Sequence, residues 1–324
     1  MKKVLALIAI LTMCIFLTGC GQTTTTGKSF IGGTEGLRIS FLPGQPPDTI
    51  TDGGTSSFGI AVKLENVGES TVKAGDLYVQ ILGIDSGIYG ETQYPDFKRA
   101  NTEDIRGAVK NFDGSVLNGG VSTVDFGELK YLGTSVGDLP QTPWADVCYK
   151  YTTQMATQIC VKSNIEQALS SNQICEVEGE KNPQNSGAPL QITSLKESYA
   201  GTDKIGLTMT ITHSGSGDNF FKVEDGAPVC NNVLSEPNAG MVKVAFSPVQ
   251  VSGKSIPVIC QSTDANGYVK LYPDNSNKAT YNLYCTLDIT GISKNVVEVP
   301  LQANLSYVYL QHITKDMILR HISK

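Results

Sequence analysis

Apolar residues alternate with small or polar residues along much of the chain. The clearest segments are residues 58–64, 77–81, 205–211, 281–289 and 297–309. A period of two places apolar side chains on one face of a strand and polar side chains on the other. Helix-like spacing is confined to residues 102–112 and to 163–169, where Ser163 and Glu166 form a capping box. The pattern therefore predicts an all-β protein made of half-buried strands.

Local signals refine this prediction at three places. Asn266–Gly267 lies between two strand-like segments and predicts a type I′ hairpin. The phase of the alternation changes after Phe126, which predicts a β-bulge at Gly127–Glu128. Pro300 occupies an outward position in the longest strand and cannot donate a backbone hydrogen bond, so we expect an edge or a bulge there.

The composition becomes polar and rich in Pro, Gly and Asn after Glu176. We interpret residues 176–187 as a linker between domain 1, residues 34–175, and domain 2, residues 188–324. Many short strands separated by turn signals favour antiparallel sandwiches of the immunoglobulin-like kind. The predicted fold is two immunoglobulin-like antiparallel β-sandwich domains.

The N-terminus predicts export. Lys2 and Lys3 precede an uncharged apolar run, Val4–Phe16, of 13 residues. This run is shorter than the roughly 20 residues that span a bilayer, and it has the flanks of a signal peptide over residues 1–19. The alternative, an ordinary buried N-terminal helix, is less favoured because no polar residue marks a second face.

The signal peptide ends in Leu17-Thr18-Gly19-Cys20, which resembles a bacterial-type lipobox. The resemblance implies that Cys20 receives a diacylglyceryl group through a thioether and becomes the first residue of the mature chain, open to further acylation such as palmitate. Two acyl chains suffice for stable anchoring. Residues 20–33 are small and polar and predict a flexible leash. We expect a lipoprotein on the extracytoplasmic face of the cell membrane, at the cell surface or in the periplasm.

Six cysteines remain after the signal peptide and Cys20 are set aside, and export favours disulfides over free buried thiols. Cys260 and Cys285 both lie on inward faces of their strands, which predicts a bridge between two sheets. Cys148 and Cys160 belong to one uninterrupted strand and lie about 40 Å apart, too far for a bond. Cys160 then meets Cys175 most easily. The remaining pair joins Cys148 to Cys230.

Charge and motifs argue against several function classes. The net charge of −6 disfavours nucleic acid as a partner, and three histidines without a C-x-x-C motif disfavour zinc. No motif for a nucleophile, a phosphate loop or a dinucleotide appears, so the sequence predicts no catalytic residue, no cofactor and no metal. His213 beside Ser216 is the nearest approach to a base and a nucleophile, and a glycine-rich turn explains it better.

A few residues have competing interpretations. Asp264 with Asn266, and Asp274 with Asn277, supply oxygen atoms suited to calcium, but Asp and Asn are also ordinary turn residues. We expect Trp144 to fill the core rather than to stack on a sugar. Tyr307 and Tyr309 share the apolar parity and are likewise expected in the core. A glycosylation sequon starts at Asn304, on an outward position of a strand.

Two hairpin-like stretches, residues 57–85 and 204–225, resemble the opening hairpins of immunoglobulin-like modules in archaeal and bacterial surface proteins, the CARDB and S-layer-associated type. In that family a strand, Asn-x-Gly and a second strand follow one another. Asn66 and Gly68 match this pattern, whereas His213 replaces the Asn in the second stretch. The resemblance implies a cell-surface β-sandwich and no catalytic residues.

Uncharacterised archaeal surface proteins are similar at three further places. These are the Tyr-rich strand Cys148–Thr153, the Gly187–Pro189 start of the second module and the closing Tyr307–Tyr309 strand.

We therefore expect a non-enzymatic protein with a structural, adhesive or ligand-binding role. It would meet the membrane through the lipid on Cys20 and a protein partner through loops or edge strands such as residues 296–309. The first alternative is an accessory subunit of an envelope assembly or transport complex. The second is a secreted hydrolase whose site is assembled from residues far apart in the sequence.

Overall fold

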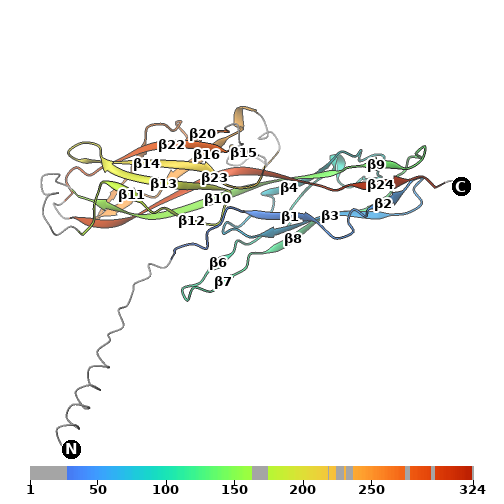
Figure 1. Ribbon diagram of the computed structural model, residues 1–324, viewed down its shortest axis with the longest axis horizontal. Coiled ribbons are helices and arrows are strands. Elements are labelled where there is room, and N and C mark those ends of the chain that lie inside the picture. The colour runs from blue at the N-terminus through green and yellow to red at the C-terminus, as the bar shows by residue number, and fades with distance from the viewer. Residues whose placement is uncertain are drawn as a thin grey trace, which may run out of the picture.

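Two strands of 18 residues, β10 (Trp144–Val161) and β23 (Val297–Thr314), are the longest elements of the described chain. They pair antiparallel along their full length, from Trp144 opposite Thr314 to Val161 opposite Val297 (Figure 1). The structure is a computed structural model. It describes residues 28–162, 174–217, 219–223, 230, 236–273, 278–292 and 296–322. Cys20, the predicted helix at 163–169 and the Asp274–Asn277 turn lie outside the described residues.

The long pair is the centre of an eight-stranded sheet with the order β20-β16-β23-β10-β4-β5, to which β12 and β15 add short pairings. The other members are β4 (Leu77–Leu82), β5 (Lys98–Ala100), β12 (Gln184–Asn185), β15 (Asn219–Phe221), β16 (Met241–Phe246) and β20 (Tyr268–Lys270).

Two smaller sheets pack on one face of this large sheet. The first has the order β1-β3-β8, with β1 (Leu37–Phe41), β3 (Phe58–Asn66) and β8 (Val121–Leu129). The second has the order β11-β13-β14-β22-β19 with β21 beside β22. Its strands are β11 (Gly179–Lys181), β13 (Leu190–Tyr199), β14 (Lys204–His213), β19 (Val258–Cys260), β21 (Tyr272–Pro273) and β22 (Ala279–Asp288). The protein is thus an all-β sandwich structure with one large core and a smaller buried cluster around Cys148 and Cys230.

The remaining elements are short. A three-stranded sheet, which we call the cap, contains β2 (Thr49–Thr51), β9 (Leu139–Gln141) and β24 (Met317–Arg320) at the C-terminal end of the molecule (Figure 1). Two hairpins and two 3₁₀ turns complete the described chain, in which no helix could cross a membrane. They are β6 (Val109–Lys110) with β7 (Val116–Leu117), β17 (Val249–Val251) with β18 (Lys254–Ile256), η2 (Pro95–Phe97) and η4 (Glu236–Asn238).

The predicted alternation matches the buried faces closely. In β14, Ile205, Leu207, Met209 and Ile211 are all fully buried. The predicted bulge is present, because the β3–β8 register shifts opposite Gly127, which has a φ of 78°.

Pro300 lies at a local edge of β23. It faces Gln158 of β10 on one side, and no strand of the described chain pairs with it on the other, because β16 joins β23 only from Ala303 onward. The strand as a whole is nevertheless central in its sheet.

Two local predictions were wrong. Residues 102–112 form no helix, because Ile105 makes an isolated bridge to Val72 with backbone hydrogen bonds in both directions. Asn266–Gly267 forms no hairpin, since the preceding strand β19 pairs with β22 and the following strand β20 pairs with β16. The Asp264 carboxylate holds this turn by accepting hydrogen bonds from the amides of Asn266 and Tyr268.

The two predicted domains share the large sheet. β10 comes from the first and β23 from the second, and the predicted linker, residues 176–187, contains β11 and β12, which pair with β13 and β10. The polar composition of this segment reflects short strands whose side chains are half-exposed. Whether either half folds alone stays a prediction.

We predict that Asp52 fastens the end of the cap. Its carboxylate accepts hydrogen bonds from the amides of Ser135 and Ile322 and lies 2.7 Å from His321 Nδ1. These hydrogen bonds, that of Ser135 first, hold the pKa of Asp52 well below its usual range. Asp52→Asn should therefore speed hydrogen exchange of the Ile322 amide at neutral pH.

In the unchanged protein the Ile322 amide should begin to lose its protection against exchange only as the pH falls below about 4, where an ordinary Asp carboxyl becomes protonated. Asp48→Asn is the control, because Asp48 makes only an exposed ion pair to Lys315. Equal exchange in the two variants would contradict the assignment.

Candidate functional site

Four tyrosines from the long strand pair form a cluster, the tyrosine ladder, in the middle of the core. Tyr149 faces Tyr309 and Tyr151 faces Tyr307 across the β10–β23 register. Their rings meet edge to face at centroid distances of 5.7 to 6.2 Å, and all four side chains are buried. Edge-to-face packing of this kind favours the aromatic quadrupoles beyond the area that is buried.

Each ladder hydroxyl binds a different part of the chain. Tyr149 donates to Gln311 Oε1 at 2.9 Å and accepts from the Leu37 amide. Tyr307 Oη lies 3.0 Å from Thr153 Oγ1 and accepts from the Leu190 amide. Burial raises the pKa of Tyr149 and of Tyr307 well above the usual value. The phenols therefore stay protonated and act as fixed donors and acceptors.

The Asn-x-Gly motif is bound to this ladder. Asn66 ends β3 and accepts a hydrogen bond from Tyr151 at 3.1 Å, while its amide group donates to the carbonyls of Ser70 and Ile105. A Cβ at Gly68 would overlap Tyr151 Oη and the Gly187 carbonyl. The motif is thus explained by a buried Asn and a close backbone approach.

The second hairpin makes an equivalent contact with a different residue. His213 ends β14, and its Nε2 lies 2.7 Å from Tyr309 Oη. The amide of Gly217 also donates to Tyr309, at 2.8 Å. Burial lowers the pKa of His213, so the ring is neutral. His213 therefore stands where the first hairpin has Asn66, and its hydrogen bond goes to Tyr309.

Glu69 holds the beginning of the described chain. Its Oε1 accepts from the Ile31 amide at 3.0 Å, and its Oε2 accepts from the amides of Gly32 and Gly187 at 3.0 and 2.6 Å. This carboxylate binds residues 31–32, which belong to the predicted leash, to the loop before β13. The sequence carried no signal for this contact beyond a Glu next to the Asn-x-Gly motif.

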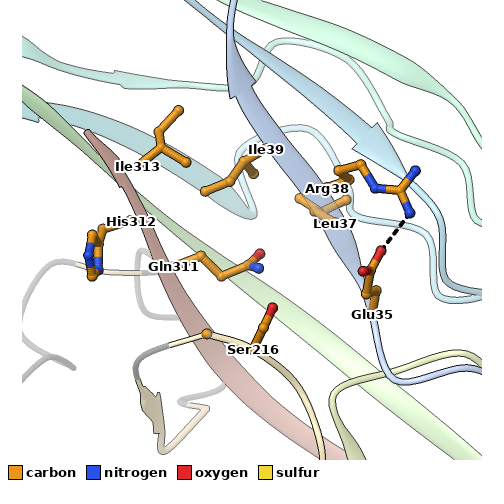
Figure 2. A pocket seen from close by; sticks show the side chains of 9 residues that line it. Glu35, Leu37, Arg38, Ile39, Ser216, Gln311, His312 and Ile313 are labelled. Carbon is orange, nitrogen blue, oxygen red and sulfur yellow. Dashed lines mark hydrogen bonds and ion pairs between the residues drawn. The ribbon is translucent and has the colours of Figure 1, made fainter. Parts of the chain in front are cut away.

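A polar pocket of about 330 Å³ opens between the segment leading into β1 and the end of β23. Figure 2 shows the Glu35–Arg38 ion pair, 2.8 Å long, on the β1 side and Gln311 with His312 on the β23 side. The other lining residues are Leu37, Ile39, Ser216, Gly217 and Ile313. The pocket can hydrogen-bond a small polar molecule, since Tyr149 fixes Gln311 and the ion pair offers a carboxylate and a guanidinium.

The cysteines pair as expected from the sequence. Disulfides join Cys148 to Cys230, Cys160 to Cys175 and Cys260 to Cys285. Cys260 and Cys285 face each other on neighbouring strands of one sheet, so the expected bridge between two sheets was wrong. Strand parity could not distinguish a bridge between two sheets from a bridge within one sheet, because thiols on the inward faces of their strands fit both arrangements. Three disulfides indicate an oxidising environment outside the cytoplasm.

The aromatic residues and the glycosylation sequon that the sequence analysis singled out lie partly in the core and partly at the surface. Tyr307 and Tyr309 are in the core as predicted, whereas Trp144 is 37% exposed at the start of β10, so its expected core position was wrong. Asn304 is exposed, with β10 and β16 on its two sides. Among the described residues no cluster of three His, Cys, Asp or Glu side chains could hold a metal ion.

One buried ion pair, Glu197 with Lys181, has no signal in the sequence. Glu197 is fully buried, accepts from the Cys160 amide and lies 3.0 Å from Lys181 Nζ. Its Oε1 finds no hydrogen-bond partner among the residues that the structure describes. Burial raises the pKa of this carboxyl.

Comparison with known proteins adds nothing to these observations, because no family model and no curated protein matches the chain.

We predict that Gly68→Ala destabilises the protein by about 1–3 kcal/mol, the usual cost of overpacking. The new methyl would push Tyr151 away from Asn66. Thermal or denaturant unfolding measures the change. Gly87→Ala is the control, because its Cβ would meet only the Asp85 carboxylate at 3.3 Å. Equal midpoints for the two variants would contradict a close approach at Gly68.

Glu69→Gln should release residues 29–33 while the core stays folded. The change removes the negative charge of the carboxylate that accepts hydrogen bonds from three backbone amides. Hydrogen bonds to a charged group are each worth roughly 1.5–3 kcal/mol. Limited proteolysis should then cut after Lys28 at lower protease concentration. Glu65→Gln serves as control, since Glu65 makes only a half-exposed ion pair with Lys63, and it should leave the cleavage unchanged.

Proposed function

We propose that this protein is a lipid-anchored extracytoplasmic lipoprotein with a non-enzymatic structural, adhesive or partner-binding role. The observation that carries the proposal is the pairing of the lipobox-like Leu17–Cys20 with a mature chain that forms three disulfides. Both features belong to an exported protein. The Asn66–Gly68 resemblance to CARDB and S-layer-associated modules is in keeping with a surface location.

The mechanism is passive. The acyl chains on Cys20 hold the chain at the membrane, and Glu69 fixes the chain again at Ile31, eleven residues later (31 − 20). The lipid and the Glu69 contact are therefore separated by a short length of chain. The sandwich core then presents loops, sheet edges and the pocket of Figure 2 at a limited distance from the bilayer.

The absence of catalysis is part of the proposal and rests on how the reactive groups are engaged. His213 Nε2 is engaged with Tyr309 at 2.7 Å, so it is poorly placed to activate Ser216. Asp264 is occupied by the turn amides of Asn266 and Tyr268. A hydrolase would need a general base within hydrogen-bond reach of its nucleophile.

A role as an accessory subunit of an envelope assembly is the second candidate. Several large apolar side chains are exposed at and near the cap, and patches of this kind mark protein interfaces. They are Leu132, Val136, Leu139, Ile318 and Ile322. Crosslinking in intact cells separates the two roles, because recovery of one stoichiometric membrane complex would favour the subunit.

We predict that Cys20→Ala abolishes lipid labelling and releases the protein from the membrane fraction. Radiolabelled or alkyne palmitate with membrane fractionation is the measurement. Cys14→Ala is the matched control, because Cys14 lies in the run that the signal peptidase removes, and it should leave labelling and fractionation unchanged. Retention of Cys20→Ala in the membrane, with no label on the unchanged protein, would reject the anchor.

A further inference from the structure

The β6–β7 hairpin exposes an unusual set of apolar side chains. Val109, Val116 and Leu117 of its strands are 51%, 50% and 64% exposed, and Phe112 in its turn is fully exposed. Val121, just after the hairpin, is 58% exposed. The hairpin projects from the sheets in Figure 1 and pairs with no other strand of the described residues. Exposed apolar groups gathered in this way mark a contact surface.

The hairpin turn is well defined by its own hydrogen bonds. The Asn111 amide donates to the Ser115 carbonyl at 2.8 Å, and the Gly114 amide donates to the Asn111 carbonyl at 3.0 Å. Asp113 accepts from the amide and the hydroxyl of Ser115. Since the polar groups of the turn bind one another, the outward position of Phe112 belongs to an ordered turn.

The hairpin lies beside the point where the chain leaves toward the proposed anchor. Lys110 Nζ donates to the Lys28 carbonyl at 2.7 Å, and the base of the hairpin is fixed by the Ala108 amide donating to Gly68. Cys20 precedes Lys28 by eight residues, which span at most about 29 Å when fully extended. A lipid on Cys20 would therefore keep this hairpin within that distance of the bilayer surface.

We propose that the β6–β7 hairpin is a second membrane contact, whose Phe112, Val116 and Leu117 side chains enter the headgroup region of the bilayer that holds Cys20. The proposal rests on the lipid anchor proposed above. Lys110 supplies an ammonium group beside the apolar residues, and Lys28, whose carbonyl it binds, is an exposed second cation. Both can meet lipid phosphates while their stems cover apolar surface.

The charge on Asp113 sets the depth of this contact. The hydrogen bonds from Ser115 lower the pKa of Asp113, so the carboxylate stays ionised at neutral pH. An ionised carboxylate next to Phe112 limits entry to the polar interface and excludes the hydrocarbon interior. Two contacts, the lipid and the hairpin, would restrict the angle at which the sandwich stands on the membrane.

Tryptophan fluorescence tests the proposal in the full-length lipidated protein. The single native tryptophan is removed by Trp144→Phe, and Phe112→Trp places a reporter at the hairpin turn. The protein is reconstituted in vesicles of phosphatidylcholine and phosphatidylglycerol, with or without brominated acyl chains. We expect a blue-shifted emission and at least two-fold quenching by bromine. Leu117→Trp, in the same background, is a second reporter should the first variant fail to fold.

Val136→Trp in the Trp144→Phe background is the matched control, because Val136 is also fully exposed but lies in the loop next to Ser135, which Asp52 binds near the cap. Its emission should remain unquenched. Vesicle flotation reports the anchor separately. Protein that floats with an unquenched reporter at 112 or 117 overturns the hairpin contact and leaves the anchor intact.

Protein that does not float overturns both proposals. A blue-shifted but unquenched reporter would place the hairpin against a second copy of this chain, which is the one protein in the vesicles, and would reject the membrane contact.

Discussion

The tyrosine ladder imposes the strictest requirement on the rest of the structure. Four phenol hydroxyls are removed from water in the middle of one core, and each must find a partner inside the protein because an unpaired buried hydroxyl is costly. The partners come from β1, β3, β13 and the loop after β14. Both small sheets are thereby located on the same face of the β10–β23 pair by polar contacts as well as by apolar packing.

This requirement unites features that look unrelated in the sequence. Asn66 and His213 differ chemically, yet each ends a strand and each binds a ladder tyrosine. Glycines follow both residues, and a side chain at Gly68 or Gly217 would strike the neighbouring tyrosine ring or hydroxyl. The two hairpins therefore resemble each other because each supplies a hydrogen-bond partner and a close backbone approach to a tyrosine of the same ladder.

The sequence predicted what depends on short-range pattern. The buried faces of β14 and β22, the bulge at Gly127 and the single long strand β10 follow from parity and turn chemistry. The pocket and the Glu69 contact depend on residues that meet only in three dimensions. The shared sheet was missed for the same reason, since nothing local to residues 144–161 indicates that residues 297–314 will pair with them. Trp144 was misassigned because hydrophobicity alone does not reveal that a strand begins at the surface.

The pairing of β10 with β23 also constrains the order of assembly. Partners in this ribbon are separated by 136 residues at one end (297 − 161) and by 170 at the other (314 − 144). Contacts this distant in sequence form slowly, because a long loop must close before they contribute. During synthesis from the N-terminus, Tyr149 and Tyr151 would lack their cross-strand neighbours until nearly all of the chain had been made. The core would then be completed late and in one cooperative step. Any chaperone that protects the nascent chain would need to stay bound until β23 has been synthesised.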